Sequence, residues 1–138
     1  MTTHLTLAEA QRLIELALAE SLRRGVKTAA AAVDARGDLI AAARLDGARH
    51  YYPDVAYGKA IAAALWEQPS RALAQRSAAN SVQQRVNGLN GGRLVFAPGA
   101  IPLRRDGQTI GALGVGGSGG DSDEEIALIA ARGLEFEV

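Results

Sequence analysis

The sequence predicts an α+β fold in which helices pack on an antiparallel sheet. Two hairpin signals arrange the extended segments in antiparallel pairs, and helical patterns stand before, between and after them. The chain lacks the alternation of single strands with long crossover helices that is typical of a parallel sheet. Its 138 residues suit one domain and are too few for two independent cores.

The first helix has clear start and stop signals. Thr6 and Glu9 have the spacing of a capping box, in which the threonine hydroxyl accepts a backbone N–H and the glutamate reaches back to the cap. Its apolar stripe consists of Ala10, Leu13, Ile14, Leu16, Ala17, Leu18 and Leu22. Arg23 and Arg24 place cations at the C-terminus and Gly25 is a typical stop, so we expect the helix to end there.

A hairpin is expected next, although the local signals conflict. The run Ala29–Ala32 has a composition that favours a helix. Asp34–Asp38 has turn chemistry, and it separates two short apolar runs, Val26–Val33 and Leu39–Arg44. This spacing favours two antiparallel strands.

The middle of the chain is predicted to be mostly helical. Pro53 suits the first turn of a helix that runs to about Trp66, and Pro69 begins another helix of roughly two to three turns. Residues 80–92 indicate a polar helical turn followed by a loop. Arg93–Phe96 is predicted to be a short strand.

The last third of the chain predicts a second hairpin and a final helix. Ile101–Arg105 and Gln108–Val115 flank Asp106-Gly107, which is the strongest kind of two-residue hairpin signal. A glycine-rich loop over residues 116–120 leads into a helix that ends at Gly133. Capping and acidic residues stand at its start, namely Asp121, Ser122 and Asp123. The predicted order is therefore α-β-β-α-α-β-β-β-α.

Charge and composition argue against several classes of partner. Fifteen Lys and Arg balance fifteen Asp and Glu, so no overall field would steer the chain to nucleic acid or to an anionic membrane. No apolar stretch reaches the roughly 18–20 residues of a membrane span, and the N-terminus lacks the features of a signal peptide. We therefore expect a cytoplasmic protein with neither nucleic acid nor membrane as a partner.

Cysteine and histidine are scarce, which limits the chemistry of the chain. It has no cysteine, so disulfides, thiolate metal sites and cysteine nucleophiles are excluded. The two histidines, His4 and His50, are too few for a multi-histidine metal site within one subunit. We therefore predict no metal site.

The glycine-rich loop leaves two interpretations open. Gly114–Gly119 matches G-x-G-x-x-G between a strand and a helix, as a dinucleotide-binding loop would. Only Leu134–Val138 remain after the final helix, which leaves no room for the further strand of a nucleotide-binding unit. Either the backbone N–H groups bind a carboxylate or phosphate, or the glycines simply make a tight connection in which Asp121 and Asp123 compete with an anion.

Aromatic residues gather in one segment. Four of the six lie within sixteen positions directly after His50, namely Tyr51, Tyr52, Tyr57 and Trp66. Such a segment could wall a flat apolar ligand, with His50 or a phenol as iron ligand, acid or base. A subunit interface, where Tyr and Trp are enriched, explains it equally well. His50, Tyr51 and Tyr57 are the candidate catalytic residues, and Lys59 is either a solvated lysine or the cation of a pocket.

Four motifs follow one another along nearly the whole chain. They are Arg44–Ala48, Lys59-Ala60, Pro98–Arg104 with Asp106-Gly107, and Gly111–Gly117 followed by Asp123-Glu124 and Ala127. Together they resemble the GlcG/HbpS family, also called the haem-degrading domain family, which includes the C-terminal domain of PduO-type proteins.

The resemblance implies a fold, a ligand class and an assembly. It implies a profilin-like α/β/α fold of three layers with a five-stranded antiparallel sheet, and it favours a strand for Ala29–Ala32. It also implies a homo-oligomer and a small-molecule ligand, with haem as the cofactor suggested by the family. A family ligand site would bring together His50, Tyr51, Lys59, Arg104 and the loop residues Gly114, Val115, Gly116, Gly117 and Ser118.

Three functions follow from these observations. The first is a homo-oligomer that binds a small molecule such as haem or another tetrapyrrole. The second is a metal-independent lyase or isomerase, in which Lys59 or Arg104 holds a small carboxylate substrate and His50, Tyr51 or Tyr57 moves a proton. The third is an assembly subunit without ligand chemistry, in which Tyr51 or Tyr52 fills a pocket of the next subunit.

Overall fold

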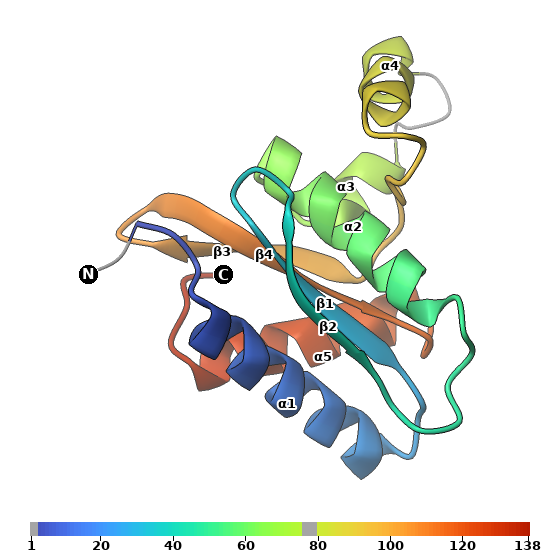
Figure 1. The fold of residues 1–138 in the computed structure, drawn as a ribbon, viewed down its shortest axis with the longest axis vertical. Helices are drawn as coiled ribbons and strands as arrows, with labels where there is room; N and C mark the ends of the chain where they lie inside the picture. Colours follow the sequence, from blue (N-terminus) through green and yellow to red (C-terminus); the bar gives the residue numbers. More distant parts are fainter. Residues whose placement is uncertain (1–2, 76–79) are drawn as a thin grey trace.

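The computed structural model describes residues 3–75 and 80–138 and arranges them in three layers (Figure 1). A sheet forms the middle layer. The helices α1 (Leu7–Arg24) and α5 (Gly120–Gly133) cover one face, and α2 (Tyr52–Trp66) with the short α3 (Ser70–Ala74) covers the other. The helix α4 (Ser81–Leu89) stands away from the sheet beyond α3.

The sheet is antiparallel, with the strand order β2-β1-β4-β3. Its strands are β1 (Ala29–Asp34), β2 (Leu39–Arg44), β3 (Ala100–Arg105) and β4 (Gln108–Gly116). Both predicted hairpins are confirmed, since β1 pairs with β2 and β3 pairs with β4. In the part of the chain that is described, the sheet has four strands, so the five-stranded sheet expected from the family resemblance is wrong.

The missing strand is the one predicted at Arg93–Phe96. This segment packs on α2 instead of joining a sheet edge: a Cβ added to Gly58 of α2 would lie 2.3 Å from the carbonyl oxygen of Arg93. The N–H of Leu94 donates to Asn87 Oδ1 at 2.9 Å, which holds the segment against the end of α4. Its apolar residues thus pack against a helix and not within a sheet. A short apolar run in the sequence does not show which of these two environments buries it.

The alanine run Ala29–Ala32 forms β1, in agreement with the predicted strand. The strand lies between β2 and β4, and residues 29–33 are fully buried. Helices cover both faces of the sheet, so the small side chains let backbone layers approach closely. The tertiary position overrides the helical propensity of alanine.

The helices follow their predicted signals with some differences in length. The capping box of α1 is confirmed, with Thr6 N–H donating to Glu9 Oε1 and Glu9 N–H donating to Thr6 Oγ1, both at 3.1 Å. α3 has five residues, fewer than the predicted two to three turns, and the end of that prediction at residues 76–79 lies outside the described residues. α5 begins without a side-chain cap, and Asp121 and Asp123 lie in its first turn instead.

The two faces of the sheet have separate apolar clusters. The larger lies under α1 and α5, and its buried members include Leu5, Leu13, Ile14, Ile101, Leu103, Ile110, Leu113, Ile126 and Phe136. The smaller lies under α2 and consists of Val33, Ala60, Ala63, Ala64, Ala100 and Ala112. No helix within residues 3–75 and 80–138 is long and apolar enough to cross a membrane.

Candidate functional site

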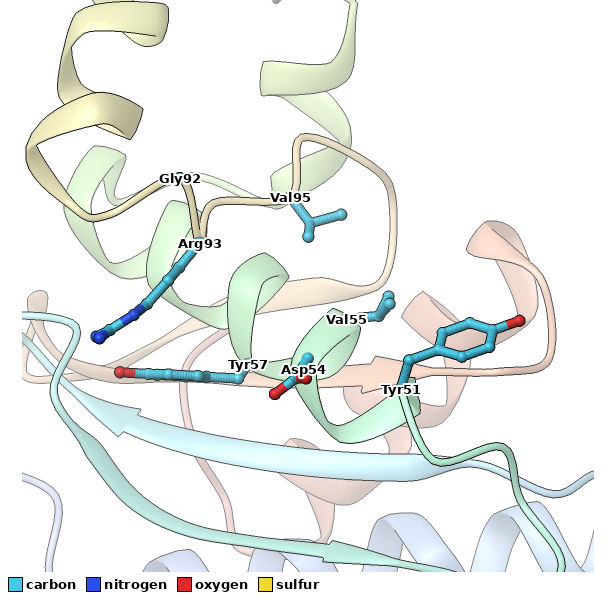
Figure 2. A pocket seen from close by; sticks show the side chains of 7 residues that line it. All are labelled: Tyr51, Asp54, Val55, Tyr57, Gly92, Arg93 and Val95. Carbon is cyan, nitrogen blue, oxygen red and sulfur yellow. The ribbon is translucent and has the colours of Figure 1, made fainter.

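A pocket of about 440 Å³ opens beside the first turns of α2 (Figure 2). Its walls come from two segments that are far apart in the sequence, the start of α2 and the connection that follows α4. It is lined by Tyr51, Asp54, Val55, Tyr57, Gly92, Arg93 and Val95. We call it the tyrosine pocket below.

Local packing brings the two walls together. Pro53 stands in the first turn of α2, where a missing N–H costs nothing, so Tyr51 and Asp54 are carried on a well-defined helix start. On the other side, the peptide of Arg93 lies directly on Gly58, where no larger residue would fit. This close contact fixes the distance of Arg93 and Val95 from α2.

The chemistry of the tyrosine pocket combines an apolar wall with one cation, Arg93, and one anion, Asp54. Val55 and Val95 are apolar, and Arg93 reaches toward the hydroxyl end of Tyr57, with Tyr51 on the other side of the pocket (Figure 2). The Arg93 side chain is exposed, and among the described residues it forms no hydrogen bond or ion pair. A free guanidinium beside aromatic rings is suited to binding the carboxylate of a flat ligand.

His50 and Tyr51 stand together at the edge of this pocket. The two rings contact edge to face with centroids 5.5 Å apart, and Tyr51 has 46% of its surface exposed. His50 is exposed and does not itself line the pocket. The predicted residues His50, Tyr51 and Tyr57 therefore lie in or next to one site, and their catalytic role stays a prediction.

Lys59 lies elsewhere, in a buried ion pair. Its ammonium donates to Asp123 Oδ2 at 3.0 Å and to the carbonyl oxygen of Val115 at 3.1 Å, and it is 4% exposed. Asp123 Oδ1 accepts the N–H of Ser118 at 2.9 Å and its hydroxyl at 2.5 Å. Lys59 therefore joins the glycine-rich loop and α5 to α2, and the anion held by this loop is the protein's own Asp123.

Arg104 is far from both groups. Its guanidinium donates to the carbonyl oxygen of Glu67 at 2.5 Å. On the sheet, Arg104 of β3 pairs with Thr109 of β4, and Thr109 lies six residues before Val115, the residue that Lys59 contacts. At ~3.3 Å per residue, Arg104 is therefore about 20 Å from Val115. The structure therefore does not bring Arg104 together with His50, Lys59 and the loop Gly114–Ser118.

Sequence reasoning missed five of the seven residues that line the tyrosine pocket, namely Asp54, Val55, Gly92, Arg93 and Val95. Asp54 and Val55 fall within the helix predicted to start at Pro53, Gly92 in the predicted loop, and Arg93 and Val95 in the predicted strand. Only the proximity of Asp54 to the aromatic segment could have pointed to it, and nothing local links Arg93 to α2. Across the described ranges, no three His, Asp or Glu side chains gather as a metal site would require.

Comparisons with known proteins give a family for the chain. The model of the family described as "Haem degrading protein HbpS-like" matches residues 5–132. A crystal structure of a double mutant of Streptomyces reticuli HbpS is 31% identical, with 97% of this chain and 89% of that chain covered and a TM-score of 0.83.

Two further structures have the same fold. Klebsiella pneumoniae ORFY is 25% identical, with 92% of this chain and 88% of that chain covered and a TM-score of 0.82. PduOC, crystallised as a complex with haem, is 24% identical, with 97% of both chains covered and a TM-score of 0.84; at this identity the likeness shows the fold alone. Among curated proteins, none matches the chain.

Proposed function

Because the chain belongs to the HbpS-like family of haem-degrading proteins, we propose that it binds a small molecule, haem or another tetrapyrrole, in the tyrosine pocket. The observation that carries this proposal is that Tyr51, Tyr57 and the free guanidinium of Arg93 line one pocket. A volume of about 440 Å³ lies within the usual range of ligand sites, roughly 300–1,000 Å³.

The residues of the pocket fit the chemical parts of a haem. Its flat apolar ring would lie against Val55, Val95 and the tyrosine rings. A propionate would pair with Arg93, because a guanidinium binds a carboxylate through two parallel hydrogen bonds. The Tyr51 phenol would hold the iron, with the imidazole of the adjacent His50 as the alternative, since both groups bind haem iron in proteins.

Haem, when bound, would supply an iron centre for redox or oxygen chemistry. The contribution of this chain is to bind and orient the ring and to limit the access of water to one side of it. The proposed enzyme acting on a small carboxylate is less well supported, because both cations assigned to hold that carboxylate are engaged elsewhere, Lys59 with Asp123 and Arg104 with Glu67.

We also propose that the chain is a homo-oligomer, as the family resemblance implies. Support comes from large apolar side chains that are exposed in the single chain, among them Val82 at 64% and Leu89 at 75% on α4. Light scattering on the purified protein measures the mass directly. A mass of one chain across the micromolar range would contradict this part of the proposal.

Haem titration tests the ligand. We expect a saturable shift of the Soret band on adding haem to the purified protein, and a different band position in Tyr51→Phe or in His50→Ala, whichever removes the group that holds the iron. Arg93→Gln should weaken binding by about tenfold or more, because it removes a charge-assisted hydrogen bond.

Matched variants control for non-specific effects. Tyr52→Phe changes the neighbouring tyrosine, which does not line this pocket, and Arg12→Gln removes an exposed arginine of α1 on the opposite face of the sheet. Both should bind haem as the parent protein does. A Soret band that never saturates, or equal affinity in Arg93→Gln and Arg12→Gln, would show that the tyrosine pocket is not the site.

A further inference from the structure

A second cavity, of about 580 Å³, lies on the other side of the start of α2. It is lined by Gly25, Val26, Lys27, Gly47, Ala48, Arg49, Tyr52 and Gly117, and we call it the cationic pocket. We propose that it is a second binding site, which takes a small anion carrying carboxylate or phosphate groups. This proposal does not depend on haem binding in the tyrosine pocket.

Its charge is the first argument. Lys27 and Arg49 are the charged residues of the lining, and both are cations, although the chain as a whole has no net charge. Neither side chain forms a hydrogen bond or ion pair within residues 3–75 and 80–138. Two uncompensated cations facing one cavity create a local positive potential that an anion of suitable size would neutralise.

The backbone around Arg49 is held in place, which is the second argument. Arg44 Nη1 donates to the carbonyl oxygen of Ala48 at 3.0 Å, and Leu45 N–H donates to the carbonyl oxygen of Thr28 at 2.9 Å. The N–H of Tyr52 donates to the carbonyl oxygen of Arg49 at 3.1 Å. A wall that is already ordered loses little entropy when a ligand binds.

Two glycines give the pocket its shape. A Cβ at Gly47 would lie 2.9 Å from Lys27 Nζ and 3.3 Å from its Cδ, so the absent side chain leaves the space along which Lys27 lies. Gly47 also has a φ of +82°, which favours glycine. A Cβ at Gly117 would lie 2.6 Å from the Tyr52 ring and 2.8 Å from the carbonyl oxygen of Lys27. Only glycine therefore fits between the Tyr52 ring and the Lys27 backbone.

Two segments singled out in the sequence meet at the cationic pocket. The motif Arg44–Ala48 supplies the ordered wall, and Gly117 is the member of the glycine-rich loop that reaches the cationic pocket. The N–H of Ser118 in the same loop is already taken by Asp123, and we assign anion binding to the side chains of Lys27 and Arg49. The consecutive residues Tyr51 and Tyr52 line different pockets, so the two sites can be tested separately.

The test is a titration of the ¹⁵N-labelled 138-residue chain with citrate and, in a second arm, with inorganic phosphate, at constant ionic strength. We expect saturable shifts of the Gly47 and Gly117 amide resonances in at least one arm, and the arm that binds more tightly identifies carboxylate or phosphate chemistry. The double variant Lys27→Gln/Arg49→Gln should weaken this binding by about tenfold or more.

The variants separate this proposal from the haem site. Lys27 and Arg49 are exposed and unpaired, so their loss should leave folding and haem titration unchanged. Arg93→Gln should leave citrate and phosphate binding unchanged. Shifts that never saturate in either arm, or that persist equally in the double variant, would overturn the cationic pocket as an anion site, whatever the outcome of the haem titration.

Discussion

The two faces of the sheet are packed with side chains of different size. Under α1 and α5 the core contains large residues such as Leu13, Ile126 and Phe136, whereas under α2 it consists mainly of alanine. Full burial of one Leu, Ile or Phe side chain contributes roughly 1.5–3 kcal/mol, so the first face holds most of the hydrophobic stabilisation.

The α2 face buries less apolar area, and its small side chains let the helix backbone lie close to the sheet. A Cβ added to Gly114 of β4 would lie 2.1 Å from the carbonyl oxygen of Ala56, so helix and strand are nearly in backbone contact there. Both candidate pockets are built around the start of this helix. The difference between the faces teaches that most of the buried apolar area lies on the face opposite the helix that carries both candidate sites.

The largest expected effect is at the buried ion pair that joins the two helical layers. Lys59→Met leaves the Asp123 carboxylate buried without its cation, and we expect a loss of about 3–5 kcal/mol in the free energy of unfolding. Chemical denaturation measures this change. The double variant Lys59→Met/Asp123→Asn should be more stable than Lys59→Met alone, because it removes the unpaired charge; equal stability of Lys59→Met and the parent would contradict the role of the pair.

A methyl group tests the close approach of α2. Gly114→Ala inserts a Cβ against the backbone of Ala56, and we expect a loss of about 1–3 kcal/mol, measured in the same denaturation experiment. Gly88→Ala in α4 is the matched control: nothing lies within 4 Å of its added Cβ, so it should be neutral or stabilising by up to about 1 kcal/mol. Similar losses at both glycines would show that α2 is not closely packed on β4.

The smallest expected effect is at the ion pairs of Glu20, a residue of α1 that is 9% exposed. Hydrogen bonds from Arg23 and Arg24 lower the pKa of Glu20 from the usual 4.5 to about 2. The stabilisation is therefore fully present above pH 4.5 and is lost as the pH falls from 4.5 to about 2. Glu20→Gln should lower Tm slightly at pH 7 and leave it unchanged near pH 2, as thermal melts at the two pH values would show; a constant difference would exclude this titration as the cause.

Elements with local signals were predicted well from the sequence. The Thr6–Glu9 capping box and the Asp106-Gly107 turn involve residues close in the chain, whose geometry depends little on the rest of the fold. The segment Arg93–Phe96 failed because its apolar residues pack on α2, a contact across more than thirty positions. For the same reason, the sequence around Arg93 does not indicate that this residue lines the tyrosine pocket.

By itself, the sequence determined the family, the two hairpins, the helices and the concentration of aromatic residues at the start of α2. Only the tertiary structure decided the four-stranded sheet, the pairing of Lys59 with Asp123 and the division of Tyr51 and Tyr52 between two pockets. The physical reason is range. Caps and turns are set by neighbouring residues, whereas the choice of partner for a buried charge depends on every layer that packs around it.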